Sequence, residues 1–438
     1  MKALRTFNGA LADLTAGRWT DPATGKIQKI PVEQIVIAET LEGAEADLVR
    51  PLHASKSLLI VSGAHTHAVL GARICRALQP LGNVREFVWK RPRCTGEGVD
   101  ELIAATAGAE ALIAVGSGTI SDSVKYAAFQ TKRDYSVFPT APMNAYTAPT
   151  ASVSFDGFKK SISCRSARGV FFDLSILAKS PPRLISAAFA DAPASRTTSQ
   201  VDWLLSHLLF NTPYTETPYT LLAYDEPTLI ENAGKLLTGD LEILAALTRA
   251  AAMVGLGTSI AGTTHPSSMG EHLISHYIDM FAGKNHPGSS HGEQVGVATL
   301  TLSRLQNQIL NAGAPPILHA TEIPRAELHT RYGAAAETMI EQASRKALSP
   351  AQADDLNRRL QKDWPAIAER LRAVTLPYEQ VHAAMKAAGC PLTATDLGLA
   401  PDFYRDAVRY SRFIRDRYTM LDLADDADQL VPFVSEGE

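Results

Sequence analysis

The stretch SSMGEHLISHYIDM, residues 267–280, carries a glutamate, Glu271, and two histidines in a sequence with helical periodicity. Histidines four residues apart on a helix project from one face, so the imidazoles of His272 and His276 can reach a common centre. This spacing permits a metal site. It is also compatible with histidines that only satisfy neighbouring polar groups on a buried helix, and the spacing alone leaves both interpretations open.

A third histidine and a carboxylate extend the candidate metal set. His291, in HGEQVGVA, lies far enough after His272 for the chain to leave one helix, turn through GKNHPGSS and return. Asp191, in RLISAAFADAPASR, follows an apolar stretch and offers a carboxylate. Catalytic metals with an open coordination position often combine histidine and carboxylate ligands, and zinc, nickel and iron all accept such a set.

A glycine-marked turn is the second candidate for chemistry. In ALIAVGSGTISDSVKYAA an apolar strand ends at Val115, and a helix containing Asp122 and Lys125 follows the turn. The turn residues are Gly116, Ser117, Gly118 and Thr119. Glycines let backbone N–H groups approach a ligand closely, and a helix N-terminus favours a phosphate. The turn therefore suits a dinucleotide pyrophosphate, although its pattern departs from G-x-G-x-x-G and similar turns occur without a ligand.

The elements around these residues divide the chain into two parts. Between Ser57 and Pro139, short apolar runs alternate with helix-like stretches, which is typical of a parallel sheet covered by helices. From about Pro182 onward, long helical periodicity takes over. The 438 residues also exceed the usual size of a single core. We therefore predict an α/β dinucleotide-binding domain over 1–182 and a helical domain over 183–438.

Composition restricts the partners and the compartment. With 45% apolar and 20% charged residues, the chain resembles soluble globular proteins, and its net charge of −4 gives no electrostatic footprint for nucleic acid or anionic membrane. No apolar run approaches the roughly 20 residues of a membrane span. The opening MKALRTFNGALADLTAG lacks the uninterrupted apolar core that we expect of a secretion signal. The four cysteines show no paired spacing: Cys75, Cys94, Cys164 and Cys390. We expect a cytoplasmic protein without nucleic-acid or membrane partners.

Several ordered blocks carry a resemblance to a known family. They run from roughly Ser57 to Gln308 and include AVGSGTISDSVKYAA, FPTAPMNAYTAPTASVSFDGFKKSI, GEHLISHYIDM and HGEQVGVATL. In these blocks the chain resembles the glycerol-1-phosphate dehydrogenase family, within the wider group of iron-containing alcohol dehydrogenases, glycerol dehydrogenases and dehydroquinate synthases. The resemblance implies a Rossmann-like N-terminal α/β domain with a parallel sheet, an all-α C-terminal domain and a catalytic divalent metal.

The resemblance also implies roles for individual residues. Asp191, His272 and His291 match the family's metal ligands, and His276 matches a histidine beside the substrate. Thr140 matches the PT loop near the nicotinamide of NAD or NADP. The cofactor-phosphate turn is matched by Gly116, Ser117, Gly118, Thr119 and Asp122. The family resemblance further favours a homo-oligomer, a homodimer or larger.

Two departures from the family pattern bear on the substrate. The family's MDGY or HDG after the PT loop is here Met143-Asn144-Ala145-Tyr146, so the neutral Asn144 replaces a substrate-facing carboxylate. An amide can hydrogen-bond a hydroxyl but cannot accept a proton as a carboxylate does. The lysine that shortly follows the family's aspartate ligand is missing, and Arg196 is only an approximate substitute because its guanidinium reaches differently.

The resemblance predicts a metal-dependent NAD(P)-linked oxidoreductase that interconverts dihydroxyacetone phosphate, or a related phosphorylated ketone, and glycerol 1-phosphate. The metal polarises the ketone oxygen and the nicotinamide delivers hydride. His276 either orients the substrate or relays a proton, and Asn144 contacts the substrate. The alternatives are a cyclase resembling dehydroquinate synthase and a nucleotide or metal sensor without turnover. Lys90 and Arg91, in WKRPR, either meet a ribose 2′-phosphate or are simply solvated, so the choice between NAD and NADP stays open.

Overall fold

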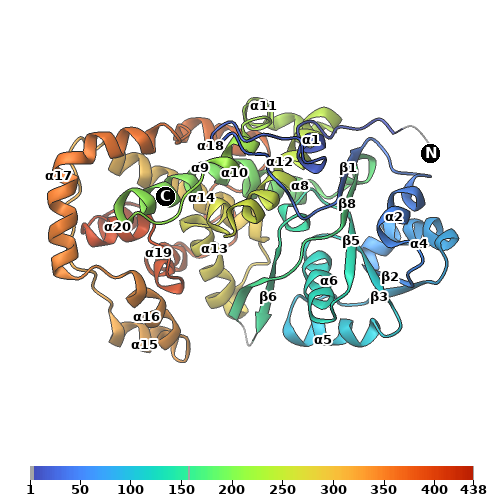
Figure 1. Cartoon of the computed structure of the whole chain (residues 1–438). Coiled ribbons are helices and arrows are strands. Elements are labelled where there is room, and N and C mark those ends of the chain that lie inside the picture. The colour runs from blue at the N-terminus through green and yellow to red at the C-terminus, as the bar shows by residue number, and fades with distance from the viewer. Residues whose placement is uncertain (1–3, 156–157, 438) are drawn as a thin grey trace. The chain divides into compact units, whose positions relative to one another are not determined.

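The chain forms two compact units in the computed structural model, which describes residues 4–155 and 158–437. Unit 1 comprises residues 1–188 and 216–263, and unit 2 comprises residues 189–215 and 264–438 (Figure 1). Unit 1 thus includes a helical segment that the predicted cut after residue 182 assigns to the second domain. These units are groups of residues in mutual contact, whereas a domain is a part of the chain that folds independently. The domain boundary after residue 182 therefore stays a prediction.

A six-stranded parallel sheet forms the centre of unit 1, as the alternation of apolar runs and helical stretches predicts. The strand order is β1-β8-β5-β4-β2-β3, and every neighbouring pair is parallel. The strands are β1 (Gln34–Ala38), β2 (Leu58–Gly63), β3 (Val84–Trp89), β4 (Ala111–Gly116), β5 (Asp134–Pro139) and β8 (Gly169–Asp173). A separate antiparallel hairpin consists of β6 (Thr150–Phe155) and β7 (Phe158–Ser163).

The sheet is buried because its central strands are apolar throughout. Every residue of β2 and β4 is buried, and Ile60 and Ile113 are at most 1% exposed. Parallel strands of this kind need cover on both faces, since the crossovers between them are helical. The crossover and covering helices are α2 (Glu45–His53), α4 (Ala72–Leu78), α5 (Gly96–Ala105) and α6 (Gly118–Gln130) (Figure 1). The predicted α/β fold of this part is confirmed.

The strand order places a topological switch point beside the glycine turn. The chain passes from β2 to β3 on one side and then returns to β4 on the other side of β2. In open parallel sheets, ligands bind outside the carboxyl ends of the strands at such a point. The ends of β2 and β4 are joined there by a hydrogen bond of 2.9 Å from Thr66 Oγ1 to the carbonyl of Val115.

The longest helix of unit 1, α12 (Leu241–Ala261), is apolar on nearly all sides. By length and composition it could cross a membrane, which corrects the expectation that no apolar run approaches that length. However, 83% of its apolar window is buried inside the protein. Its glycines and alanines allow close packing, and Thr147 Oγ1 donates a hydrogen bond of 2.7 Å to the carbonyl of Ala252. In the described structure α12 is a core helix.

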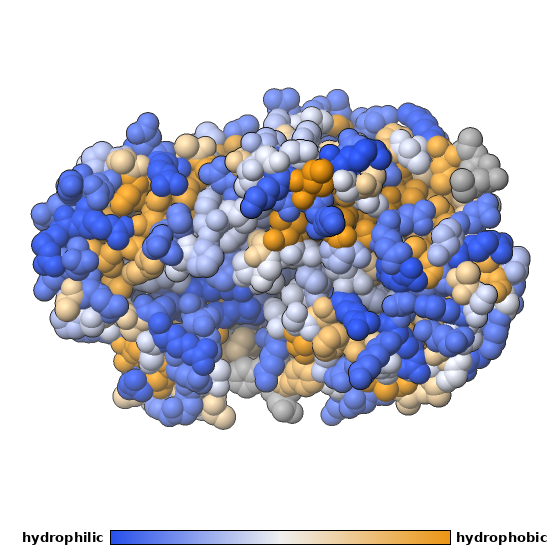
Figure 2. Space-filling view, viewed as in Figure 1, coloured by the Kyte–Doolittle hydropathy of each residue, from blue (hydrophilic) through white to orange (hydrophobic). Residues whose placement is uncertain are grey.

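Unit 2 consists of helices and connecting loops, with no strand among its described residues, as the long helical periodicity predicts. Its helices pack around one hydrophobic core that includes Ile274, Leu302 and Trp364. The principal helices are α9 (Ser195–Phe210), α13 (Gly270–Phe281), α14 (His291–Asn311), α15 (Arg325–Tyr332), α16 (Ala335–Lys346), α17 (Pro350–Arg372), α18 (Tyr378–Ala387), α19 (Pro401–Tyr410), α20 (Met420–Asp426) and α21 (Leu430–Glu436). On the face drawn in Figure 2, hydrophobic and hydrophilic side chains are intermixed over the surface.

Candidate active site

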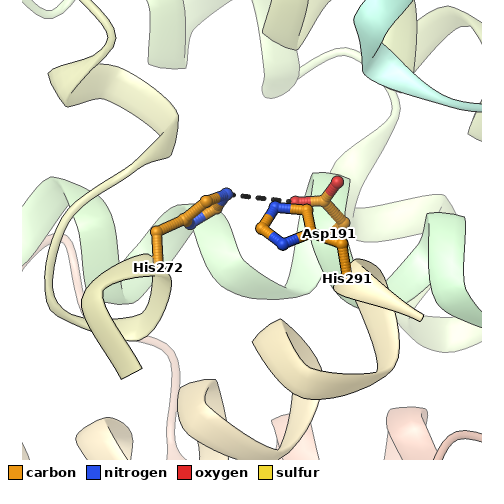
Figure 3. Close-up of side chains that lie close together, drawn as sticks. All are labelled: Asp191, His272 and His291. Atoms are coloured by element: carbon orange, nitrogen blue, oxygen red, sulfur yellow. Dashed lines mark ion pairs between the residues drawn. The ribbon is translucent and has the colours of Figure 1, made fainter. Parts of the chain in front are cut away.

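Three predicted metal ligands converge in unit 2 from separate elements. Asp191 lies in the π-helix η4 (Ala190–Ala194), His272 lies in the first turn of α13, and His291 is the first residue of α14. One ligand atom from each residue lies within 4.8 Å of the others, and Figure 3 shows the three side chains facing one another. The histidine pair and the carboxylate that the sequence offers separately are therefore brought together by the fold.

Close helix packing positions these side chains. A Cβ added at Gly296 of α14 would lie 2.8 Å from the Cβ of Ala190, the residue before Asp191, so the approach of α14 to η4 requires glycine there. The N-terminus of α14 is fixed by a capping box, in which the backbone N–H of Ser290 donates to Glu293 Oε2 at 2.6 Å. The first residue of the capped helix is His291, whose direction follows from this cap.

Hydrogen bonds to Nδ1 orient both histidine rings. Nδ1 of His272 lies 2.9 Å from Glu271 Oε1, and Nδ1 of His291 lies 2.8 Å from Ser275 Oγ. Ser275 Oγ in turn donates to Gln294 Oε1 at 2.8 Å, so it accepts from His291. With a proton on each Nδ1, both Nε2 atoms present lone pairs, which is the tautomer that a metal-ligating histidine needs.

The carboxylate behind His272 is itself fully buried. Glu271 is 0% exposed and accepts hydrogen bonds from the backbone N–H of Met269 and the hydroxyl of Ser199. Burial alone would lower the pKa of His272, but the hydrogen bonds and charges of Asp191 and Glu271 outweigh it and raise that pKa to about 9. Two carboxylates therefore make this cluster attractive to a cation, which can be a proton or a metal ion.

The donor set fits a divalent metal. Nε2 of His272 lies 3.4 Å from Asp191 Oδ1, close to the separation of about 3.4 Å expected for two ligand atoms that are each roughly 2.1 Å from a tetrahedral ion. Two imidazole nitrogens and one carboxylate oxygen match catalytic sites that keep a position open for water or substrate. Asp191, His272 and His291 could thus hold a zinc, nickel or iron ion.

His276 lies next to this cluster, outside the triad. Its ring centroid is 5.6 Å from that of His291 and 6.0 Å from that of His272. Nη2 of Arg415 lies 3.2 Å from His276 Nδ1. A guanidinium can only donate, so Nδ1 accepts and the ring proton of His276 is on Nε2. His276 therefore offers a neutral N–H donor beside the candidate metal position.

In unit 1 the predicted cofactor turn lies at the carboxyl end of β4. Gly116 is the last residue of the strand, and a Cβ there would lie 2.8 Å from the Cβ of Ile120. Ser117 is the N-cap of α6, and Gly118 and Thr119 are its first residues. A Cβ on Gly118 would meet only Met143 Sδ, at 3.6 Å. The backbone of the turn thus leaves space for a phosphate at the N-terminus of a 13-residue helix.

Asp122 lies one turn further along α6 and makes structural contacts. Its Oδ1 accepts from Lys125 Nζ at 3.1 Å, and its Oδ2 accepts from the backbone N–H of Ser152 at 3.1 Å. Lys125 is fully buried and also donates to the carbonyls of Ala145 and Thr150, at 2.6 and 2.8 Å. The two side chains anchor the loop before β6 to α6. The cofactor-phosphate contact of Asp122 stays a prediction beside this role.

Thr140 and Asn144 lie in the loop after β5. The backbone N–H of Thr140 donates to the carbonyl of Gly116 at 3.1 Å, which places the loop next to the glycine turn. Asn144 opens the short 3-10 helix η3 (Asn144–Tyr146). Thus all of the predicted cofactor residues and Asn144 belong to unit 1, whereas the metal candidates and His276 belong to unit 2.

Some residues around the site were missed by the sequence interpretation. Glu271 was noted without a role, although its position directly before His272 could have indicated a partner for that ring. Arg415 gave no local signal, because it lies far along the chain from His276. The proposed lysine substitute, Arg196, donates to Gln200 Oε1 at 2.7 Å on its own helix. Lys90 and Arg91 are exposed after β3, which leaves both of their interpretations open.

Comparison with known proteins supports the resemblance. Residues 36–181 match the family model described as iron-containing alcohol dehydrogenase. A curated glycerol-1-phosphate dehydrogenase [NAD(P)+] of Methanosarcina mazei is 32% identical over 285 residues, which cover 64% of this chain and 78% of that protein. The chain belongs to the glycerol-1-phosphate dehydrogenase family. Its N-terminal part lies in the wider family of iron-containing alcohol dehydrogenases.

Other members of the glycerol-1-phosphate dehydrogenase family extend the match. The protein so named from Bacillus subtilis is 26% identical over 418 residues, covering 93% of this chain and 94% of that protein. A 31% identical stretch in the Halalkalibacterium halodurans protein covers 56% of this chain and 64% of that protein. The solved structure of glycerol dehydrogenase from Schizosaccharomyces pombe shares the fold, with a TM-score of 0.63 and 15% identity over 93% of this chain and 91% of that chain.

Proposed function

We propose that this chain is a metal-dependent, NAD(P)-linked oxidoreductase that interconverts dihydroxyacetone phosphate and glycerol 1-phosphate. The observation that carries the proposal is the convergence of Asp191, His272 and His291 in a chain of the glycerol-1-phosphate dehydrogenase family. The curated relatives from Bacillus subtilis and Methanosarcina mazei bear that activity in their names. An intact set of candidate ligands argues against a sensor that has lost turnover.

Asp191, His272 and His291 would hold the metal ion, which when bound supplies a Lewis acid that polarises the carbonyl oxygen of the ketone. The reduced nicotinamide, which the turn at Gly116–Thr119 would hold, would supply the hydride for the carbonyl carbon, and solvent would supply the proton for its oxygen. Glu271 keeps His272 in the ligating tautomer through Nδ1, and Ser275 does the same for His291. These supporting contacts hold the ligands in place before substrate arrives.

His276 orients the substrate in this proposal. Its Nε2–H can donate to a substrate oxygen, while its Nδ1 accepts from Arg415. Because the neighbouring guanidinium cannot give up a proton at neutral pH, a proton lost from Nε2 would not be replaced through Nδ1. The contact thus favours a hydrogen-bond donor over a proton relay, the other role that the sequence leaves open for His276.

The turn at Gly116–Thr119 would bind the pyrophosphate of the nicotinamide cofactor through its backbone N–H groups, with Thr140 and Asp122 beside it. Whether the enzyme takes NAD or NADP depends in this proposal on Lys90 and Arg91 after β3. The metal is zinc, nickel or iron, since the mixed nitrogen and oxygen ligands suit all three. We further propose a cytoplasmic homo-oligomer, a homodimer or larger, on the family resemblance.

Steady-state oxidation of NADH and of NADPH with a panel of ketones tests the proposal. We expect metal-loaded protein to consume one or both cofactors with dihydroxyacetone phosphate, and chelation followed by metal return to abolish and restore the rate. Good turnover of another ketone with none of dihydroxyacetone phosphate would overturn the substrate assignment. Phosphate release would instead support the cyclase, and binding without turnover the sensor.

A further inference from the structure

The segment after the 3-10 helix η8 (Ser411–Ile414) sends two arginines toward α13, the helix that carries His272 and His276. Arg415 donates to Nδ1 of His276 at 3.2 Å. Arg417 donates to the carbonyl of Ser268 and, at 2.5 Å, to Oγ1 of Thr264, both of which precede α13 in the sequence. One guanidinium therefore contacts the histidine that we assign to the substrate, and the other, two residues further along the chain, contacts the segment just before the same helix.

The fold treats Arg417 differently from a neighbouring arginine whose role is structural. Arg412, in η8, is buried and ion-paired with Asp422 at 3.6 Å and with Asp425. Arg417 bonds to neutral oxygens, and among residues 4–155 and 158–437 no carboxylate lies within 4.0 Å of its side chain. The acid between the two arginines, Asp416, is half exposed and lies 3.6 Å from Arg345. The charge of Arg417 is therefore not compensated by a direct ion pair.

The pKa of Arg417 reflects its uncompensated charge. Loss of water around the guanidinium lowers the pKa of Arg417 to about 9, and the positive charge of Arg415 adds to the effect. The pKa of Arg415 is also lowered, again chiefly by burial. A partly buried positive charge costs free energy unless a counter-ion or hydrogen-bond acceptors offset it. A bound anion would supply both at this position.

The segment that carries these arginines is held rigidly. The carbonyl of Arg417 accepts from Lys346 Nζ at 2.7 Å, and Lys346 pairs with Asp422 at 2.7 Å. Three residues beyond Arg417, the backbone N–H of Met420 donates to Asp202 Oδ1 at 3.0 Å. The guanidinium groups are thus presented by an anchored backbone, which lowers the entropy that anion binding would cost.

We propose that Arg415 and Arg417 form the phosphate-binding subsite of the substrate site, an inference that rests on the proposed function. Dihydroxyacetone phosphate carries its phosphate one carbon away from the carbonyl group, so a phosphate subsite must lie close to the metal and to His276. Arginine forks match phosphate oxygens and can bind them in pairs. These two arginines would bind the phosphate in place of the lysine that follows the aspartate ligand in the family and that is missing after Asp191 in this chain.

The test compares Arg417→Gln and Arg415→Gln with Arg358→Gln, a matched control that removes an exposed arginine of unit 2 whose ion pair, with Asp355, lies on its own helix. For metal-loaded protein we expect Arg417→Gln to raise KM for glycerol 1-phosphate about 10- to 100-fold, the loss typical of charge-assisted hydrogen bonds, with a smaller change in kcat. Arg415→Gln should raise KM and lower kcat, because it also releases His276. Arg358→Gln should match the wild type.

Binding measurements separate a phosphate contact from a structural role. By titration calorimetry in the presence of the reduced cofactor, which cannot oxidise an alcohol, the wild type should bind glycerol 1-phosphate more tightly than glycerol, and this preference should vanish in Arg417→Gln. Arg417→Lys, which keeps the charge, should recover part of it and decides the matter if the glutamine variant does not fold. Equal weakening of both ligands would overturn the subsite.

The outcomes distinguish the inference from the proposed function. If the wild type neither binds nor turns over phosphorylated substrate, the proposed function fails. If the wild type uses glycerol 1-phosphate and both arginine variants keep its KM, the proposed function stands and the subsite is wrong. An increase in KM for Arg196→Gln alone would move the subsite to Arg196.

Discussion

The glycine turn of unit 1 and the histidine cluster of unit 2 prepare for their ligands in different ways. At the turn, the groups aimed at a ligand are backbone N–H groups, and the nearby ionisable side chains Asp122 and Lys125 are occupied with one another and with the loop. At the cluster, side chains supply every candidate ligand atom, and buried Glu271 holds one of the rings. Backbone geometry governs the first region and side-chain chemistry the second, so substitutions should act differently in each.

The largest effect is expected from His272→Ala or His291→Ala. Each leaves only two of the three protein ligands, so metal content should fall to background and turnover should fall with it. Elemental analysis after gel filtration measures this directly. His319→Ala, which alters an exposed histidine in unit 2, is the matched control and should retain metal. Full metal occupancy in both ligand variants would remove the metal assignment.

His276→Ala should keep the metal and lose turnover, by roughly 10²- to 10³-fold in kcat, the loss typical of one hydrogen-bond donor that acts in the transition state. Within unit 2, this variant distinguishes a side chain that contacts the substrate from a side chain that binds the metal. Metal content and kcat should be measured on the same preparation. Metal loss equal to that of His272→Ala would show that the ligand set is misassigned.

In unit 1, Gly118→Val should raise KM for the nicotinamide cofactor about 10-fold, because a branched side chain fills the approach to the helix N-terminus. Ser117→Ala should change KM far less, because the serine side chain makes no capping hydrogen bond to α6. Cofactor titrations followed by fluorescence give both affinities. If the serine variant proves as harmful as the valine variant, recognition at the turn depends on side chains after all.

Asn144→Asp restores the carboxylate that the family pattern has at this position. If the amide holds a substrate hydroxyl, we expect turnover of dihydroxyacetone phosphate to be preserved or raised a few-fold. The measurement is kcat/KM for both proteins on dihydroxyacetone phosphate and on unphosphorylated ketones. A loss of about 1–3 kcal/mol in transition-state stabilisation would show that a new charge has been buried without a partner, and that the substrate site is adapted to the amide.

His53→Gln, in unit 1, should leave turnover unchanged and alter only the stability of the protein in acid. Burial, with some help from Lys56 and Arg168, lowers the pKa of His53 to about 4 from 6.5. The folded state therefore binds this proton more weakly than the unfolded state does. The associated stability is complete above pH 6.5 and is lost as the pH falls toward 4, by up to about 3 kcal/mol.

Chemical denaturation at pH 7 and at pH 4.5 tests this titration. The wild type should lose more unfolding free energy between the two pH values than His53→Gln, which lacks the titrating ring but can still hydrogen-bond Ser136. Identical pH dependence in the two proteins would mean that other groups control acid stability. Equal kcat at pH 7 is the accompanying control.

The sequence predicted those features that depend on residue type and local pattern. Apolar runs located β2 and β4 because parallel strands must be buried on both faces. The candidate ligands were recognisable because only a few residue types bind metals. The residues that orient the site histidines were harder to predict. The contact between Arg415 and His276 depends on tertiary packing across 139 positions, and no local spacing encodes it.

The membrane expectation failed for a related reason. The 21 residues of α12 contain charged side chains near their start and middle, which hide the apolar character of the segment from simple inspection. Arg249 is accommodated by the carboxylate of Asp225, with Nε 3.0 Å from Oδ2, so the helix can still be buried over most of its length. Pairing of this kind is visible only in the folded chain.

The π-helix η4 makes the position of Asp191 sensitive to the winding of the backbone. A π-helical turn holds one residue more than an α-helical turn, and η4 lies between α8 (Pro182–Phe189) and α9. If the same residues wound as α-helix, each would advance by about 100° about the helix axis, which is more than in a π-helix, and Asp191 would rotate relative to α9. Its carboxylate would then leave the face that meets His272. The local type of helix, and not the residue types alone, therefore assembles the ligand set.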